Sequence, residues 1–169
     1  MTRSDTANDA ELQALSERLQ RACLARRLSV TAAESCTGGG VASAITDIAG
    51  SSAYFETGYV TYSNAAKTRL LGVSEATLET RGAVSRETVE AMVAGACRES
   101  GADLGVAVSG VAGPGGGSME KPVGTVWFAW GSELTQHAEC RRFDGDRRAV
   151  REQAVRVALE GLIRWLEAA

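Results

Sequence analysis

The sequence has little of what most metal, nucleic-acid and membrane proteins depend on. Of its 169 residues one is histidine, and the four cysteines contain no C-x-x-C pair. A metal site is therefore not expected, and reduced thiols are expected rather than disulfides, because this is not a small secreted scaffold. The formal net charge of −3 argues against a broad basic surface for nucleic acid.

Long apolar runs are also absent. No stretch approaches the roughly 20 apolar residues that a transmembrane helix needs, so no membrane association is expected. The first ten residues are polar and lack the apolar core of a signal peptide, so we expect a cytoplasmic location. With 44% hydrophobic and 23% charged residues, the chain has the composition and length of one well-packed domain.

The order of helical and β-type segments predicts a single-domain, layered α/β fold. We expect a disordered segment at 1–8 and one domain at 9–169. A late hairpin, turned around residues 131–134, predicts a mixed sheet covered by helices, whose strand order the sequence does not determine. The helices are expected at 9–27, 37–48, 64–71, 86–100 and 146–167, with a helical turn at 75–80, and the strands at 28–33, 55–62, 104–109, 123–130 and 135–143.

A glycine-rich segment joins the first expected strand to the second expected helix. It reads Glu34-Ser35-Cys36-Thr37-Gly38-Gly39-Gly40. This position exposes a serine hydroxyl beside free backbone N–H groups at a helix N-terminus, which stabilise negative charge. A serine nucleophile with an oxyanion site needs this arrangement, and so does a phosphate cradle. A plain helix N-cap with a tight glycine turn is the structural alternative.

A nucleophilic serine requires a base, and the sequence offers few. His137 lies in an alternating strand that is expected to expose it, which disfavours a Ser-His-Asp triad. Lys67, one of only two lysines, follows a buried-looking strand, and burial at a helix N-terminus would lower its pKa as a base requires. Tyr62 could relay or position a proton. A solvated Lys67, a strand-end Tyr62 and a Cys36 thiolate nucleophile remain alternatives.

A second glycine-rich loop, 109–118, follows the expected strand at 104–109. Its glycines allow the backbone to approach a phosphate or a ribose closely. The loop contains neither a Walker A pattern nor G-x-G-x-x-G, and a flexible turn is the alternative. Arg147 begins the last expected helix and could reach a phosphate.

Taken together, these segments closely resemble the CinA C-terminal domain family, the family of the nicotinamide-nucleotide amidases. The resemblance covers nearly everything from Leu28 to the last helix, and the combination of motifs is specific although each piece alone is weak. The matching stretches are 31–39, 45–47, 50–52, 59–64 with Lys67, 82–85, 109–117, 121–126, and 145–147 with Arg151.

The resemblance implies deamidation of nicotinamide mononucleotide to nicotinate mononucleotide and ammonia, by a serine–lysine mechanism without a metal or cofactor. It implies that Ser35 is the nucleophile, Lys67 the general base and Tyr62 an assisting residue. The implied oxyanion donors are the backbone amides of Cys36, Thr37 and Gly38. The residues implied near the nucleotide substrate are Ser109, Gly113, Gly115, Gly116 and Arg147.

Two other functions compete with an amidase. A nucleotide-binding or regulatory module would keep both glycine loops without requiring Lys67. A protein-interaction module for competence or DNA damage is the other, although the acidic net charge and the lack of basic–aromatic interleaving count against direct DNA binding. Exposed Trp127, Trp130 or Trp165 would favour self-association, so we expect a homo-oligomer.

Overall fold

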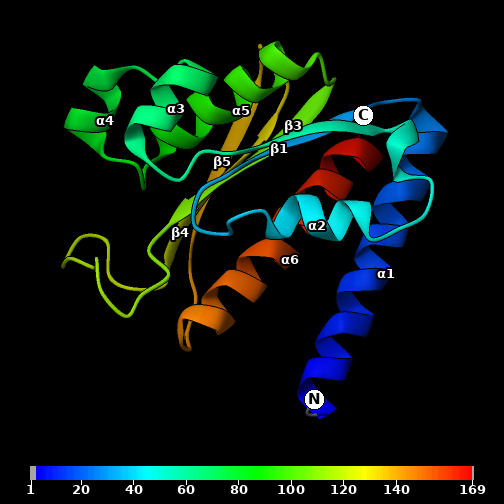
Figure 1. The fold of residues 1–169 in the computed structure, drawn as a ribbon, viewed down its shortest axis with the longest axis horizontal. Helices are drawn as coiled ribbons and strands as arrows, with labels where there is room; N and C mark the ends of the chain where they lie inside the picture. The colour runs from blue at the N-terminus through cyan, green and yellow to red at the C-terminus, as the bar shows by residue number, and fades with distance from the viewer. Residues whose placement is uncertain (1–2, 169) are drawn as a thin grey trace.

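The computed structural model describes residues 3–168, which form a five-stranded sheet between two layers of helices (Figure 1). The strand order is β2-β1-β3-β4-β5. The β2–β1 and β1–β3 pairs are parallel, and the β3–β4 and β4–β5 pairs are antiparallel, which confirms the expected mixed sheet. The strands are β1 (Val30–Glu34), β2 (Phe55–Val60), β3 (Leu104–Gly110), β4 (Thr125–Gly131) and β5 (Gln136–Arg142).

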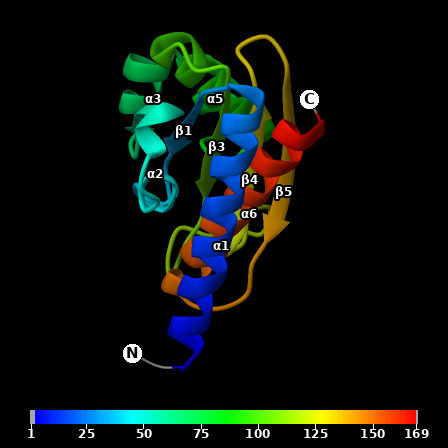
Figure 2. The same ribbon diagram turned by 90° about the vertical axis from the view of Figure 1, so that its right-hand side faces the viewer.

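Each face of the sheet has its own helical layer and its own core. Figures 1 and 2 show α1, α2 and α6 on one face, and Figure 1 shows α3, α4 and α5 on the other. Strand β3 serves both cores, since Val106 and Val108 face the first and Ala107 faces the second, as the two-residue period of a strand requires. The helices are α1 (Arg3–Arg26), α2 (Gly40–Thr46), α3 (Asn64–Leu71), α4 (Glu75–Arg81), α5 (Arg86–Ser100) and α6 (Arg147–Ala168), with a 3-10 turn at Ser51–Ala53.

The first helix begins at Arg3, so the prediction of disorder for residues 1–8 is wrong for residues 3–8; Met1 and Thr2 lie outside the described residues. Long-range contacts to α6 explain the difference. The Asn8 side-chain oxygen accepts a hydrogen bond from Arg156 at 2.7 Å, and Asp5 pairs with Arg148 at 3.6 Å. Sequence periodicity carries no information about partners so distant in the chain.

The second helix is shorter than predicted, since 37–48 was expected and α2 covers only Gly40–Thr46. Gly38 and Gly39 have φ values of 57° and 104°, in the left-handed region, so the chain turns twice before the helix begins. Gly39, not Ser35, is therefore the N-cap. Gly40 then lets α2 approach α6, because a Cβ there would lie 2.9 Å from Val155 Cγ2.

The tryptophans do not form the exposed surface on which we based self-association. Trp130 is buried, and its indole N–H donates to the Ala158 carbonyl at 2.9 Å. Trp127 and Trp165 are half-buried and pack against the two cores. The argument for a homo-oligomer from Trp130 is therefore wrong, and self-association stays a prediction.

The sheet topology places two sequence motifs side by side. The chain leaves β1 toward α2 on one face and enters β3 from α5 on the other. Glu34 and Val108 are register partners, so Ser35 and Ser109 follow at the carboxyl ends of two adjacent parallel strands. Open α/β sheets bind ligands at such a switch point.

Candidate active site

Ser35 and Lys67 are in contact at the carboxyl end of β1. Lys67 Nζ lies 3.0 Å from Ser35 Oγ. Lys67 is 1% exposed and Ser35 is 9% exposed. The lysine reaches this place because α3 begins directly after β2: Ser63 caps the helix by accepting from the Ala66 amide at 3.0 Å, and Lys67 lies one turn further on.

The environment of Lys67 favours a neutral amine. Burial lowers the pKa of Lys67 from its ordinary value of 10.5, and no carboxylate within the described residues forms a salt bridge with it. Its Nζ donates to the carbonyls of Thr61 at 2.8 Å and Tyr62 at 3.2 Å. A neutral amine has two N–H groups and one lone pair. In that neutral form, with both N–H groups on carbonyls, which only accept, the lone pair is left for the Ser35 hydroxyl.

Residues 35–39, which we call the nucleophile turn, are anchored by hydrogen bonds to the Glu34 side chain, directly before the turn. The Glu34 carboxylate is 1% exposed and accepts from the Thr37 hydroxyl at 2.6 Å and from the amides of Val41 at 2.7 Å and Ala42 at 3.0 Å. The sequence predicted that amides at this helix N-terminus would be free for a ligand. That expectation is wrong for α2, because Glu34 already binds them.

Three amides of the turn have no oxygen acceptor among residues 3–168, those of Cys36, Thr37 and Gly39, and the first two directly follow Ser35. The Gly38 N–H donates to the Ser35 carbonyl at 3.0 Å and so closes the turn. From α6, Arg151 donates to the carbonyls of Cys36 at 3.0 Å and of Thr37 at 3.3 Å.

The alternative nucleophile and base are disfavoured by their surroundings. Cys36 is buried, and burial raises the pKa of its thiol to about 11, so the thiolate is scarce at neutral pH. His137 is exposed on the edge strand β5, as the sequence predicted, where it contacts Glu139 at 3.3 Å. Strands β3 and β4 separate β5 from β1, so a triad through His137 does not form with Ser35.

A cavity of about 320 Å³ opens above the Ser35–Lys67 pair. Ala83, Val84, Val111 and Ala112 supply its apolar walls. Most of the predicted site residues line it; Thr37 and Gly38 are not in the lining. The predicted residues in the lining are Ser35, Cys36, Tyr62, Lys67, Ser109, Gly113, Gly115, Gly116 and Arg147.

Arg147 bridges the rim of this cavity. Its guanidinium donates to the Gly113 carbonyl at 2.8 Å and to the Tyr62 phenol at 2.9 Å. The Tyr62 side chain is 60% exposed, and the hydrogen bond of this residue to Lys67 comes from its backbone carbonyl. Tyr62 thus touches the lysine and the rim through two different groups.

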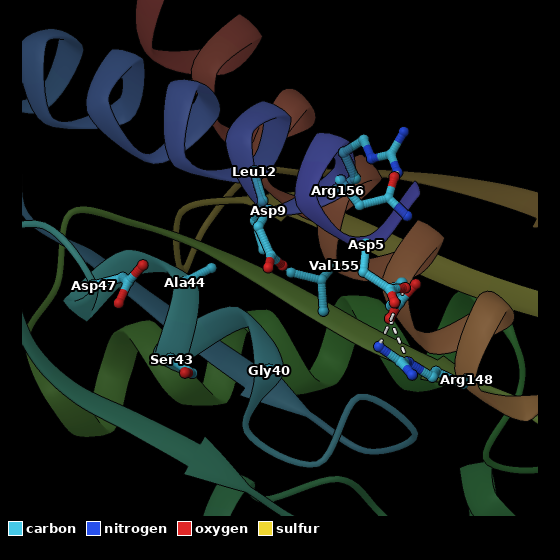
Figure 3. Close-up of a pocket in the computed structure, with 12 residues that line it drawn as sticks. Asp5, Asp9, Leu12, Gly40, Ser43, Ala44, Asp47, Arg148, Val155 and Arg156 are labelled. Atoms are coloured by element: carbon cyan, nitrogen blue, oxygen red, sulfur yellow. Dashed lines mark hydrogen bonds and ion pairs between the residues drawn. The ribbon is translucent and has the colours of Figure 1, made fainter. Parts of the chain in front are cut away.

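A second cavity, of about 260 Å³, lies between α1, α2 and α6 (Figure 3). It contains acidic side chains such as Asp9 and Asp47, together with arginines that are already paired: Arg148 contacts Asp5, and Arg156 contacts Glu11 at 3.1 Å. Its lining includes none of the predicted site residues.

Across the described part of the chain no cluster of His, Cys, Asp and Glu could hold a metal ion. None of the helices in that part has the length and apolarity to cross a membrane.

Sequence reasoning gave no role to two residues that shape the site, Glu34 and Arg151. A signal existed for each. Glu34 is an acidic residue directly before a glycine-rich turn and a helix, where a carboxylate is favoured. Arg151 follows Arg147 by four residues, so both lie on one face of α6.

Comparison with known proteins places this architecture in a family. The model of the CinA C-terminal domain matches residues 12–166. A Pseudomonas putida protein named nicotinamide-nucleotide amidohydrolase PncC is 66% identical over 134 residues, covering 79% of this chain and 84% of that protein. A protein of the same name from Escherichia coli is 56% identical over 158 residues, covering 91% and 94%.

Solved structures agree with the sequence comparison. A CinA superfamily protein from Klebsiella pneumoniae has a TM-score of 0.90 at 42% identity, covering 94% of this chain and 99% of that one. A competence/damage inducible protein from Agrobacterium tumefaciens has a TM-score of 0.88 at 46% identity, covering 93% and 96%. By sequence and by fold, the chain belongs to the CinA C-terminal domain family.

Proposed function

We propose that this chain hydrolyses the carboxamide of nicotinamide mononucleotide to nicotinate mononucleotide and ammonia. The names of relatives at 66% and 56% identity support the substrate. The observation that carries the chemistry is the buried contact of 3.0 Å between Lys67 Nζ and Ser35 Oγ, with both remaining directions of the amine occupied by carbonyls.

Neutral Lys67 takes the proton of Ser35 Oγ as that oxygen attacks the carboxamide carbon. Negative charge develops on the carboxamide oxygen, and the amides of Cys36 and Thr37, which directly follow Ser35 and have no oxygen acceptor among residues 3–168, are the proposed donors to it. One such donor is typically worth roughly 10²–10³ in rate. The carbon–nitrogen bond then breaks as Lys67 delivers its proton to the departing NH2 group, which leaves as ammonia. Water hydrolyses the resulting ester, which releases the carboxylate product and restores Ser35.

The nucleotide part of the substrate lies along the rim and the glycine loop. Arg147 supplies a charged fork at the rim, suited to a phosphate. Ser109 and the loop from Gly113 to Gly116 lie beside it in the cavity lining. Tyr62 assists by holding Arg147 through its phenol and Lys67 through its carbonyl. The proposed mechanism uses no metal or cofactor. The proposal also includes a cytoplasmic location, a homo-oligomeric state and no nucleic-acid partner.

The first experiment measures ammonia release from nicotinamide mononucleotide without added metal. Native protein should turn over, Ser35→Ala should lose activity, and Lys67→Met should fall by roughly 10²–10⁴ because the base is gone. Lys67→Arg should be equally inactive, since arginine keeps the charge but does not act as a base. Exposed Ser52 provides the matched control, and Ser52→Ala should behave like native protein.

Folding of each variant is checked by its thermal unfolding midpoint. No turnover by folded native protein would contradict the proposed function and favour a nucleotide-binding module. Turnover that survives in Ser35→Ala would contradict the assignment of the nucleophile alone.

A further inference from the structure

Arg147 and Arg151 lie one helical turn apart on α6, and they contact opposite sides of the site. Arg147 lines the cavity and spans its rim. Arg151 does not line the cavity; its Nε and Nη2 donate to the carbonyls of Cys36 and Thr37. Ser35 and Cys36 do line the cavity. The nucleophile turn therefore stands between the Arg151 guanidinium and the space where a substrate would bind.

The geometry of a peptide group links this contact to the site. The Cys36 carbonyl and the Thr37 N–H belong to one planar trans peptide, so they point in opposite directions. With the carbonyl held toward α6 by Arg151, the Thr37 N–H points away from α6. That amide has no acceptor within residues 3–168.

We propose that Arg151 is a positioning residue that keeps the Thr37 N–H directed at the cavity as an oxyanion donor. The inference rests on the proposed function for its catalytic consequence. If the Cys36–Thr37 peptide turned over, the Cys36 carbonyl would face the developing oxyanion and repel it. The bond from the Thr37 hydroxyl to Glu34 holds the residue from the other side.

The chemistry of arginine suits this task. Its planar fork engages two successive carbonyls at once, whereas a lysine ammonium acts as a single point charge. A cation on the carbonyl also polarises the peptide and strengthens its N–H as a donor. The oxyanion exists only in the transition state and the intermediate, so this arrangement acts on kcat and not on substrate binding.

The test compares Arg151→Met and Arg151→Lys with Arg148→Met, a control on the same helix whose exposed side chain reaches Asp5 and Glu152 instead. We expect kcat to fall by about 10²-fold in Arg151→Met, the typical loss for one oxyanion donor. KM for nicotinamide mononucleotide and the pH profile should stay as in native protein, because Lys67 and Arg147 are intact. Arg151→Lys should recover only part of the loss, and Arg148→Met should match native protein.

Crystal structures of native protein and Arg151→Met supply a readout that does not need turnover. We expect the Cys36–Thr37 peptide to be turned, or split between two orientations, in the variant. An unchanged peptide would overturn the inference, whether or not kcat falls. A turned peptide with native kcat would overturn it as well, since Thr37 would then not be a donor. Inactive native protein would refute the proposed function alone, and the orientation of the peptide would still decide the role of Arg151. If Arg151→Met does not fold, Arg151→Lys takes its place in both measurements.

Discussion

At the scale of single residues, the surroundings of one amine, that of Lys67, disfavour its charged form. Lysine is ordinarily protonated at neutral pH, and a buried ammonium without a carboxylate partner is unfavourable. Burial lowers the pKa of Lys67, which is the direction that its proposed role as a base requires. Burial raises the pKa of Cys36, its neighbour in the site, to about 11. The same physical cause thus favours the proposed base and disfavours the thiol as a competing nucleophile.

The lowered pKa of Lys67 predicts how stability and activity depend on pH. Between that lowered value and 10.5 the Lys67 side chain binds more protons in the unfolded chain than in the folded one, so its contribution to the free energy of unfolding rises with pH across this window. Below the window Lys67 destabilises the fold by a constant amount. The free energy of unfolding of native protein minus that of Lys67→Met should therefore rise across the window, which urea unfolding of both proteins at a series of pH values would detect. The kcat/KM of native protein should rise with pH up to the lowered pKa, as the free base forms in the folded protein, and should level off above it.

A flat stability difference between native protein and Lys67→Met would show that the pKa of Lys67 is not lowered. Loss of kcat/KM with rising pH in this window would contradict its role as a base.

At the scale of elements, α2 is a short helix whose start is set by the strand before it. The Glu34 carboxylate ends β1 and binds the first amides of α2, so strand, turn and helix form one hydrogen-bonded unit. A glutamine offers one acceptor oxygen where Glu34 uses both, and its amide group would face donors. We expect Glu34→Gln to lower the free energy of unfolding by about 1–3 kcal/mol, the cost of unsatisfied buried polar groups.

The matched control is Glu56→Gln on the edge strand β2, where the side chain is exposed. Its effect should lie within about 0.5 kcal/mol of zero. Denaturant unfolding of the two variants beside native protein makes the comparison. Equal stability of both variants would mean that Glu34 does not hold the turn in place.

The elements themselves were largely predictable, and the contacts between them were not. Apolar periodicity and turn residues placed nearly every helix and strand within two residues of its observed ends, because these signals are local. The start of α1 was wrong because Arg148 and Arg156, far along the chain, extend the helix. The choice between Lys67 and His137 needed the strand order, which puts β5 at the far edge of the sheet. From the residues alone both stayed open, and the family resemblance pointed to Lys67.

At the scale of the whole molecule, the parallel pairing of β1 and β3 brings the two glycine motifs together at the carboxyl ends of these strands. The turn after β1 carries Ser35, and the loop after β3 lines the same cavity. Lys67 comes from α3, and Arg147 comes from the start of α6. Each contributes from a separate element, so binding of a ligand there should stabilise the fold as a whole.

This coupling gives a test that separates binding from chemistry. In Ser35→Ala, nicotinamide mononucleotide should bind without being consumed and should raise the thermal midpoint in a concentration-dependent way. At a hundred times the dissociation constant the expected gain is about 2.7 kcal/mol. Adding Arg147→Met to this background should shift the response to higher concentration, because the rim loses its anion-binding fork, while Arg148→Met should leave it in place. If the thermal midpoint responds to the nucleotide in the same way with and without Arg147, the phosphate binds elsewhere in the cavity. If the midpoint does not respond at all, the cavity is not the binding site of this nucleotide.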